Sequence, residues 1–166
     1  MLRALAESRD ALLEAAASVP EAKACIRPVP DRWSVLELVE HVGLVEDAMF
    51  ALLTNTMKPA AKASDGSREE LFWSRVASRD RPIAAPEGVR PKGRFASLDA
   101  AKDYFRESRA RSIRYVTECR ENLRAGTVIH PTVGEITGQE LLIILALHPA
   151  RHVGQIREVR ESLGLS

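Results

Sequence analysis

The 166-residue sequence has little cysteine, little net charge and no long apolar run. Its two cysteines, Cys25 and Cys119, lie far apart and in no zinc-site spacing, which favours a reducing, cytoplasmic setting. Basic residues (24) nearly balance acidic ones (23), so global charge gives no drive toward nucleic acid or an anionic membrane. No apolar run reaches membrane-spanning length, and the mixed charges of the first residues are unlike a signal peptide.

The sequence also lacks a clear strand pattern, and helical periodicity dominates instead. Apolar residues recur at three- and four-residue spacing in four segments. We expect helices over residues 2–18, from Ser34 onward, from Ser97 to near Gly126, and from Thr137 to Gly164. The pairs Ser34/Glu37 and Thr137/Glu140 have the spacing of capping boxes, which fix where two of these helices begin.

The segment between the second and third long helices breaks this periodicity. A short helix is expected over 68–78, with Ser67 and Glu70 as its capping box. The following stretch, RPIAAPEGVRPKGR, carries three prolines and two glycines, which indicates an irregular crossover. The sequence therefore predicts one all-α domain over 1–166, a four-helix bundle with a long crossover between the second and third helices.

Three of the four histidines fall on apolar helix faces. His148 and His152 are four residues apart on the inward face of the last helix, and His41 is on the inward face of the second. They are either hydrogen-bonded core residues or the ligands of one cation. A divalent cation would satisfy three buried imidazoles at once, and bundle cores commonly hold metals in this way.

One residue complicates this pair of histidines. Pro149 directly follows His148, and inside a helix it removes a backbone hydrogen bond and crowds the carbonyl of Leu145. The apolar pattern continues through the proline without a change of phase. We therefore expect a kink that aims His148 at the metal.

Two stretches resemble the DinB superfamily of DinB/YfiT-like metalloenzymes. RWSVLELVEHVGLVEDAMF is similar to its "W-[ST]-x-x-E-x-x-x-H" signature, and HPTVGEITGQELLIILALHPARHVGQI is similar to its closing "H-x-x-x-H-x-x-Q-[IL]" helix. The resemblance implies an up-down-down-up bundle, often a homodimer. It also implies that His41, His148 and His152 bind a divalent metal, usually zinc or nickel, with solvent completing the coordination shell.

The chemistry implied is metal-dependent. An open position on such a metal would activate a bound water or thiol. Relatives include transferases that use low-molecular-weight thiols, so the resemblance favours a thiol S-transferase acting on a small molecule. A metal-dependent hydrolase and a non-catalytic dimeric bundle are the alternatives. Near-zero charge and the absence of a recognition motif argue against nucleic-acid binding.

Further residues are candidates to support the site. Gln155, Glu37, Glu46 and His130 could orient or border the histidines; the alternatives are a core amide for Gln155, a helix cap for Glu37 and a turn residue for His130. Arginines could hold the carboxylates of an anionic cosubstrate, while their usual interpretation is a solvated helix face. The candidates are Arg94, Arg106 and Arg109.

Overall fold

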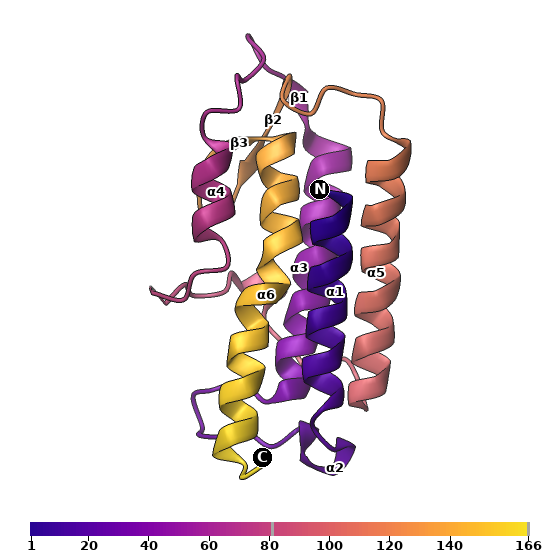
Figure 1. Ribbon diagram of the computed structural model, residues 1–166, viewed down its shortest axis with the longest axis vertical. Coiled ribbons are helices and arrows are strands. Elements are labelled where there is room, and N and C mark those ends of the chain that lie inside the picture. The colour runs from indigo at the N-terminus through magenta and orange to yellow at the C-terminus, as the bar shows by residue number, and fades with distance from the viewer. Residues whose placement is uncertain (81, 166) are drawn as a thin grey trace.

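Four long helices pack side by side in the computed structural model, which describes residues 1–80 and 82–165 (Figure 1). They are α1 (Leu2–Ala17), α3 (Val35–Thr56), α5 (Leu98–Glu118) and α6 (Gly138–Ser162). α1 packs mainly on α6 and α5, and α3 packs on the same two helices. In Figure 1, α1 and α6 run downward while α3 and α5 run upward. The predicted four-helix bundle is therefore present.

Two of the long helices begin where the sequence places them. The Ser34 hydroxyl accepts from the Glu37 amide at 3.3 Å, and the Glu37 carboxylate accepts from the Ser34 amide at 2.9 Å. Thr137 and Glu140 form the same reciprocal pair at the start of α6. Both capping boxes satisfy amide groups that the first turn of a helix leaves without partners.

Short elements occupy the ends of the bundle and its crossover. They are α2 (Glu21–Ala24), α4 (Glu69–Arg75) and the 3-10 helix η1 (Glu87–Val89). The capping box predicted for α4 was wrong: its N-cap is Arg68, and no side chain caps it. Arg81, within the predicted irregular crossover, lies outside the described residues.

A small sheet corrects the all-α prediction. Its strands β1 (Lys58–Pro59), β2 (Gly126–His130) and β3 (Gly134–Thr137) pair antiparallel in the order β1-β2-β3. The sheet lies over the end of the bundle where α6 begins (Figure 1). α5 accordingly ends at Glu118 and does not reach Gly126, which opens β2 instead. A Cβ at Gly126 would lie 2.8 Å from Met57, so close packing explains this glycine.

The bundle core consists of two apolar clusters along its length. One includes Leu5 and Leu145, and the other includes Leu12 and Phe105. Between them lies a buried polar group formed by Arg109, Glu46 and Ser8, which we call the polar layer. Among the described residues, no helix has the length and apolar character needed to cross a bilayer.

Candidate metal centre

The fold brings the three predicted histidines together halfway along the bundle. One ring nitrogen from each of His41, His148 and His152 lies within 4.8 Å of the others. The ring centroids are 4.4 to 5.2 Å apart. His41 comes from α3, and the other two come from successive turns of α6. No carboxylate or thiol joins this group among the residues that the structure describes.

The His41 ring is held in one orientation and one tautomer. Its Nδ1 lies 2.7 Å from the Val89 carbonyl oxygen, and a carbonyl can only accept, so Nδ1 carries the proton. Nε2 is then left with a free lone pair, as a metal ligand requires. The ring centroid of Trp33 is 4.9 Å from that of His41, so the indole packs against the imidazole.

Glu40 supports this arrangement, and the sequence analysis missed it. Its fully buried carboxylate accepts from the backbone amide of Lys92 at 2.8 Å and from that of Arg94 at 3.3 Å. These bonds tie the end of the crossover to α3, one residue from His41. The crossover in turn supplies the Val89 carbonyl. The available signal was an acidic residue inside an otherwise apolar helix face.

His148 and His152 face each other across one turn of α6. Their Nε2 atoms are 3.0 Å apart. Two nitrogens that each bind one cation at about 2.1 Å lie roughly 3 to 4 Å apart, so this spacing suits shared coordination. Nδ1 of His152 and Oε1 of Gln155 are both buried without a hydrogen-bond partner among the described residues. The Gln155 amide is nevertheless close enough to raise the pKa of His152 against the larger effect of burial.

Burial keeps the three imidazoles uncharged at neutral pH. It lowers the pKa of His41 below its usual 6.5, although the bond to Val89 opposes the shift. Burial and the neighbouring imidazoles lower the pKa of His148 well below 6.5. Burial, followed by the repulsion that a protonated His41 ring would exert, lowers the pKa of His152 to about 3. Neutral imidazoles are the form that binds metal.

These shifts predict a metal-free protein that loses stability in mild acid. The unfolded chain takes up protons on its histidines below about pH 6.5, while the folded chain keeps them neutral. The free energy of unfolding should therefore fall as the pH drops from 7 to 5, and the slope from His152 alone should approach about 1.4 kcal/mol per pH unit about one unit below pH 6.5. Urea unfolding in the presence of a chelator measures this slope. His152→Gln should reduce it, and an unchanged slope in that variant would contradict the assignment.

Arg109 and Glu46 pair with each other in the core, so neither takes the role predicted for it, which was cosubstrate binding for Arg109 and histidine orientation for Glu46. Arg109 is fully buried, and its guanidinium donates to both carboxylate oxygens of Glu46 at 2.8 and 2.9 Å. Glu46 therefore does not orient a histidine. Arg109 cannot meet a cosubstrate because no part of it is exposed. The two charges were misassigned because their partners lie on different helices, far apart in the sequence.

The two other predicted support residues lie away from the histidines. Glu37 is the capping carboxylate of α3 and also pairs with Arg27. His130 is at the end of β2, where its Nδ1 accepts from the amides of Thr132 and Val133 at 3.1 and 3.3 Å. It is the turn residue that the alternative interpretation described. Gln155 alone of the four stays beside the site.

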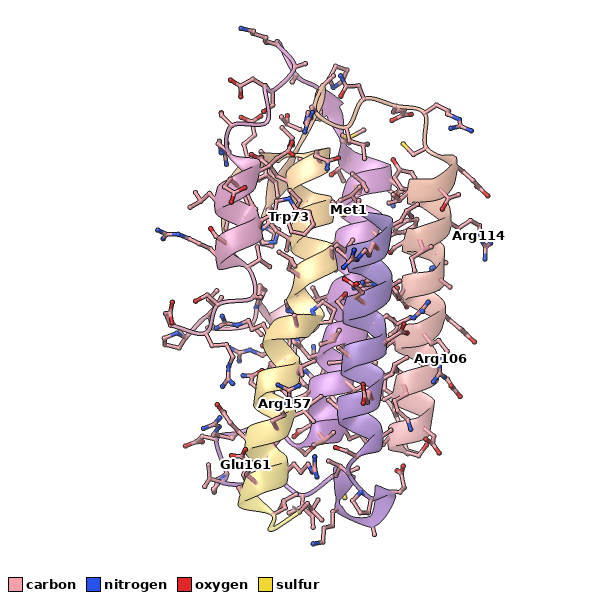
Figure 2. The ribbon with its side chains drawn as sticks, viewed as in Figure 1. Met1, Trp73, Arg106, Arg114, Arg157 and Glu161 are labelled. Atoms are coloured by element: carbon pink, nitrogen blue, oxygen red, sulfur yellow. The ribbon has the colours of Figure 1, made fainter. Side chains whose placement is uncertain are left out.

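The two other predicted arginines are exposed on the bundle surface. Arg106 forms an ion pair with Asp103 on the same helix and points away from the bundle (Figure 2). The backbone of Arg94 is held by Glu40. Its side chain is exposed and lies near Tyr104, where its charge opposes the rise in the phenol's pKa to about 12 that burial and Asp47 cause. The arginines that line the cavity near the site are Arg32 and Arg90.

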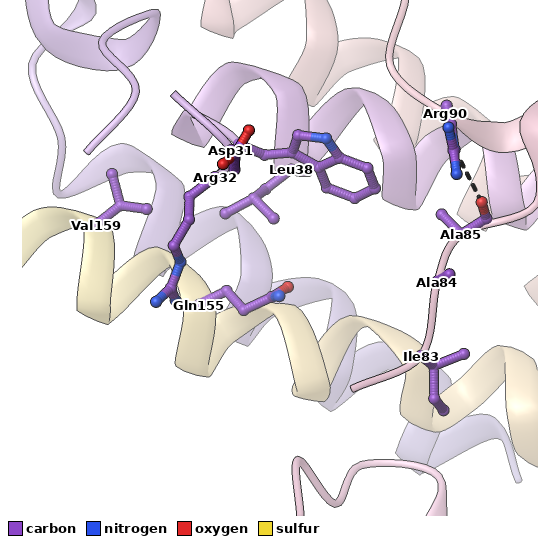
Figure 3. A pocket seen from close by; sticks show the side chains of 10 residues that line it. Asp31, Arg32, Leu38, Ile83, Ala84, Ala85, Arg90, Gln155 and Val159 are labelled. Atoms are coloured by element: carbon purple, nitrogen blue, oxygen red, sulfur yellow. Dashed lines mark hydrogen bonds between the residues drawn. The ribbon is translucent and has the colours of Figure 1, made fainter. Parts of the chain in front are cut away.

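A cavity of about 370 Å³ opens next to two residues that neighbour the histidines, although no histidine is among the described residues that line it (Figure 3). Trp33, which packs on His41, and Gln155, which acts on His152, both line it. Leu38, Val159 and Ile83 supply apolar walls, Arg32 and Arg90 supply positive charge, and Asp31 supplies negative charge. The volume is in the usual range of small-molecule sites. The cavity is therefore linked to the three histidines through Trp33 and Gln155, and no imidazole in the described part of the chain forms part of its wall.

Comparison with known proteins places these features in a family. Residues 4–156 match the DinB superfamily. The uncharacterized protein YuaE of Bacillus subtilis (strain 168) is 21% identical over 137 residues, which are 82% of this chain and 83% of that protein.

Two solved structures share the fold. YfiT from Bacillus subtilis, a four-helix bundle of unusual topology, superposes with a TM-score of 0.62 at 19% identity and covers 99% of this chain and 86% of its own. A conserved protein from Enterococcus faecalis gives a TM-score of 0.67 at 19% identity, covering 98% and 95%. The family match extends over nearly the whole sequence, from the first turn of α1 to the last third of α6, and this chain belongs to the DinB superfamily.

Proposed function

We propose that the chain is a metal-dependent enzyme that acts on a small molecule at a divalent cation held by His41, His148 and His152. The observation that carries this proposal is the convergence of three neutral ring nitrogens within 4.8 Å, next to residues that line a cavity of ligand size. The Nε2 atoms of His148 and His152 are 3.0 Å apart, a spacing that one shared cation would explain.

The donor set suits a catalytic metal. A divalent cation bound by three neutral imidazoles keeps its full charge and at least one open position, so it acts as a Lewis acid and lowers the pKa of a bound nucleophile. The chain's own residues hold the ligands in place: the Val89 carbonyl fixes the His41 tautomer, and Glu40 fixes the crossover that carries Val89. Gln155 is positioned to orient His152.

Hydrolysis is the first candidate reaction. YfiT, whose fold this chain shares, is described as "a probable metal-dependent hydrolase", and water is the nucleophile such an enzyme activates. The cavity would receive the substrate with its apolar part against Trp33 and Leu38. Arg90 and Arg32 at its border would meet an anionic group of the substrate by exchanging their present partners, Glu87 and Glu158.

Thiol transfer is the second candidate, and one observation favours it. The cluster contains no carboxylate among the described residues, so no obvious general base stands beside the open position. A thiol, with an ordinary pKa near 8.5, needs less assistance to ionise than water does. An S-transferase acting with a small thiol would therefore fit the same three ligands. Zinc or nickel as the native metal and a homodimeric state stay predictions, which elemental analysis and sedimentation decide.

Metal titration tests the proposal directly. Cobalt(II) or nickel(II) added to chelator-treated, untagged protein should bind one ion per chain and quench the fluorescence of Trp33, whose ring packs on His41. Trp73 lies on α4, so Trp73→Phe isolates the Trp33 signal. Hydrolysis of small carboxylate-bearing esters and amides should then require metal and stop when it is chelated. Saturable quenching that is lost on chelation is the expected result.

The cobalt protein separates the two reactions. Small thiols should produce a thiolate-to-cobalt absorption band if the chain is a thiol transferase, and metal-dependent ester or amide cleavage should appear if it is a hydrolase. Protein that neither quenches nor binds one ion per chain would contradict the metal centre itself. The non-catalytic bundle would then be the remaining interpretation.

A further inference from the structure

Arg109 connects the four helices of the bundle through a single guanidinium. Its Nη1 donates to the Leu5 carbonyl and to the Ser8 hydroxyl on α1, both at 2.9 Å. Nε and one Nη2 proton go to Glu46 on α3. The remaining Nη2 proton goes to the Leu145 carbonyl on α6 at 2.8 Å. Five bonds match the five donors that an arginine has, so no donor is left over.

The Leu145 carbonyl is the acceptor that Pro149 leaves without its helical partner. In an uninterrupted α-helix that oxygen would accept from the amide of residue 149, and proline has no amide hydrogen. α6 nevertheless continues as one helix from Gly138 to Ser162 and changes direction partway along its length (Figure 1). Such a kink persists where another group satisfies the freed carbonyl. Here that group is a charged guanidinium from α5.

We propose that Arg109 is a positioning residue for the metal centre: by holding the Leu145 carbonyl at the Pro149 kink, it sets where His148 stands relative to His41 and His152. His148 is the residue directly before the proline, between the held carbonyl and the second histidine of α6. Its distance to His152 Nε2, 3.0 Å, is therefore set at the kink. This proposal rests on the proposed function for its catalytic meaning, while the geometry it describes belongs to the metal-free protein.

Three substitutions separate the bond to Leu145 from the other contacts of Arg109. Arg109→Lys keeps a cation beside Glu46, but one ammonium cannot reproduce the planar fork and also reach Leu145. Ser8→Ala is the matched control, because it removes another acceptor of the same guanidinium and leaves the bond to α6 in place. Pro149→Ala restores the missing amide, so the Leu145 carbonyl no longer depends on Arg109.

The experiment is a double-mutant cycle read by cobalt affinity and by the ring NMR signals of the histidines in the metal-free protein. Arg109→Lys should weaken cobalt binding about 10- to 100-fold, the usual effect of losing a group that orients metal ligands, and should move the His148 ring signals. Ser8→Ala should change affinity by less than about threefold. In a Pro149→Ala background, Arg109→Lys should cost much less affinity than in the wild-type background.

Equal losses in both backgrounds, or a loss with Ser8→Ala as large as with Arg109→Lys, would overturn the proposal. Should Arg109→Lys fail to fold, Pro149→Ala alone decides: removing the kink should displace the His148 signals and weaken cobalt binding, and unchanged values would refute the idea. If wild-type protein binds no cobalt, the proposed function fails separately. The ring signals of His148 in the metal-free variants still decide the role of Arg109.

Discussion

Replacing His152 with alanine is expected to abolish stoichiometric metal binding and the thermal stabilisation that metal gives to the wild-type protein. His152 supplies one of three imidazoles, and its Nε2 lies 3.0 Å from that of His148, so its loss leaves one ligand on each helix. A ligand that binds only the folded state stabilises it by about 2.7 kcal/mol at 100 times its Kd. Elemental analysis and melting curves with and without zinc measure both effects.

Two variants provide the controls. His130→Ala removes a histidine that caps the β2–β3 turn and should leave metal content at one ion per chain. Gln155→Leu keeps all three imidazoles but removes the amide beside His152, so it should weaken metal affinity by about 10- to 100-fold without abolishing it. Full metal occupancy in His152→Ala would remove this residue from the centre.

Replacing Glu46 with alanine is expected to lower the free energy of unfolding by about 3 to 5 kcal/mol, because it leaves the fully buried Arg109 without its counter-charge. Burial raises the pKa of the Glu46 carboxyl, and the pairing with Arg109 works against that shift. The pair is thus maintained by mutual attraction in a site that favours neither charge alone. Urea unfolding at pH 7 measures the loss, which is large for a domain of this size.

Removing both charges separates an unpaired charge from lost packing. The double variant Glu46→Leu/Arg109→Met should recover much of the stability lost by Glu46→Ala, since apolar residues can replace a buried pair at little cost or with a gain. Glu46→Gln should fall between the two, because the amide oxygen still accepts one bond from the guanidinium. A double variant as unstable as Glu46→Ala would show that packing, and not the unpaired charge, causes the loss.

Local signals in the sequence were sufficient for the long helices and insufficient for the sheet. Capping boxes at Ser34 and Thr137 marked two helix starts, because the bonds involved lie within four residues. β2 and β3 are short, and Val128 and Ile136 are buried by pairing across a turn at Gly134. The β-branched run TVI followed by proline and glycine was the signal for this hairpin. Gly126, at the start of β2, was instead taken as the end of the third long helix.

Some features of the site could likewise be predicted from local sequence patterns, whereas others depend on contacts between residues far apart in the sequence. Helical periodicity alone put the three histidines on inward faces, and the structure brings those faces together. The contact between His41 and Val89 depends on the path by which the irregular crossover returns to α3, and helical periodicity in the sequence cannot predict that path. Arg109 looked like one member of an exposed arginine series. Only the packing of four helices around it shows that it is enclosed.

The polar layer also constrains how the helices can slide along one another. Ser8 lies between the buried Leu5 and Leu12 of α1, and Arg109 lies four residues after the buried Phe105 of α5. Moving α5 by one turn along α3 would bring the guanidinium level with apolar residues and leave Glu46 without its partner. Such a misaligned packing would bury two separate charges, at a cost of several kcal/mol each. The buried ion pair therefore selects one axial alignment of α5 against α3, and the bond from the same guanidinium to the Leu145 carbonyl extends it to α6, on which two of the three imidazoles stand.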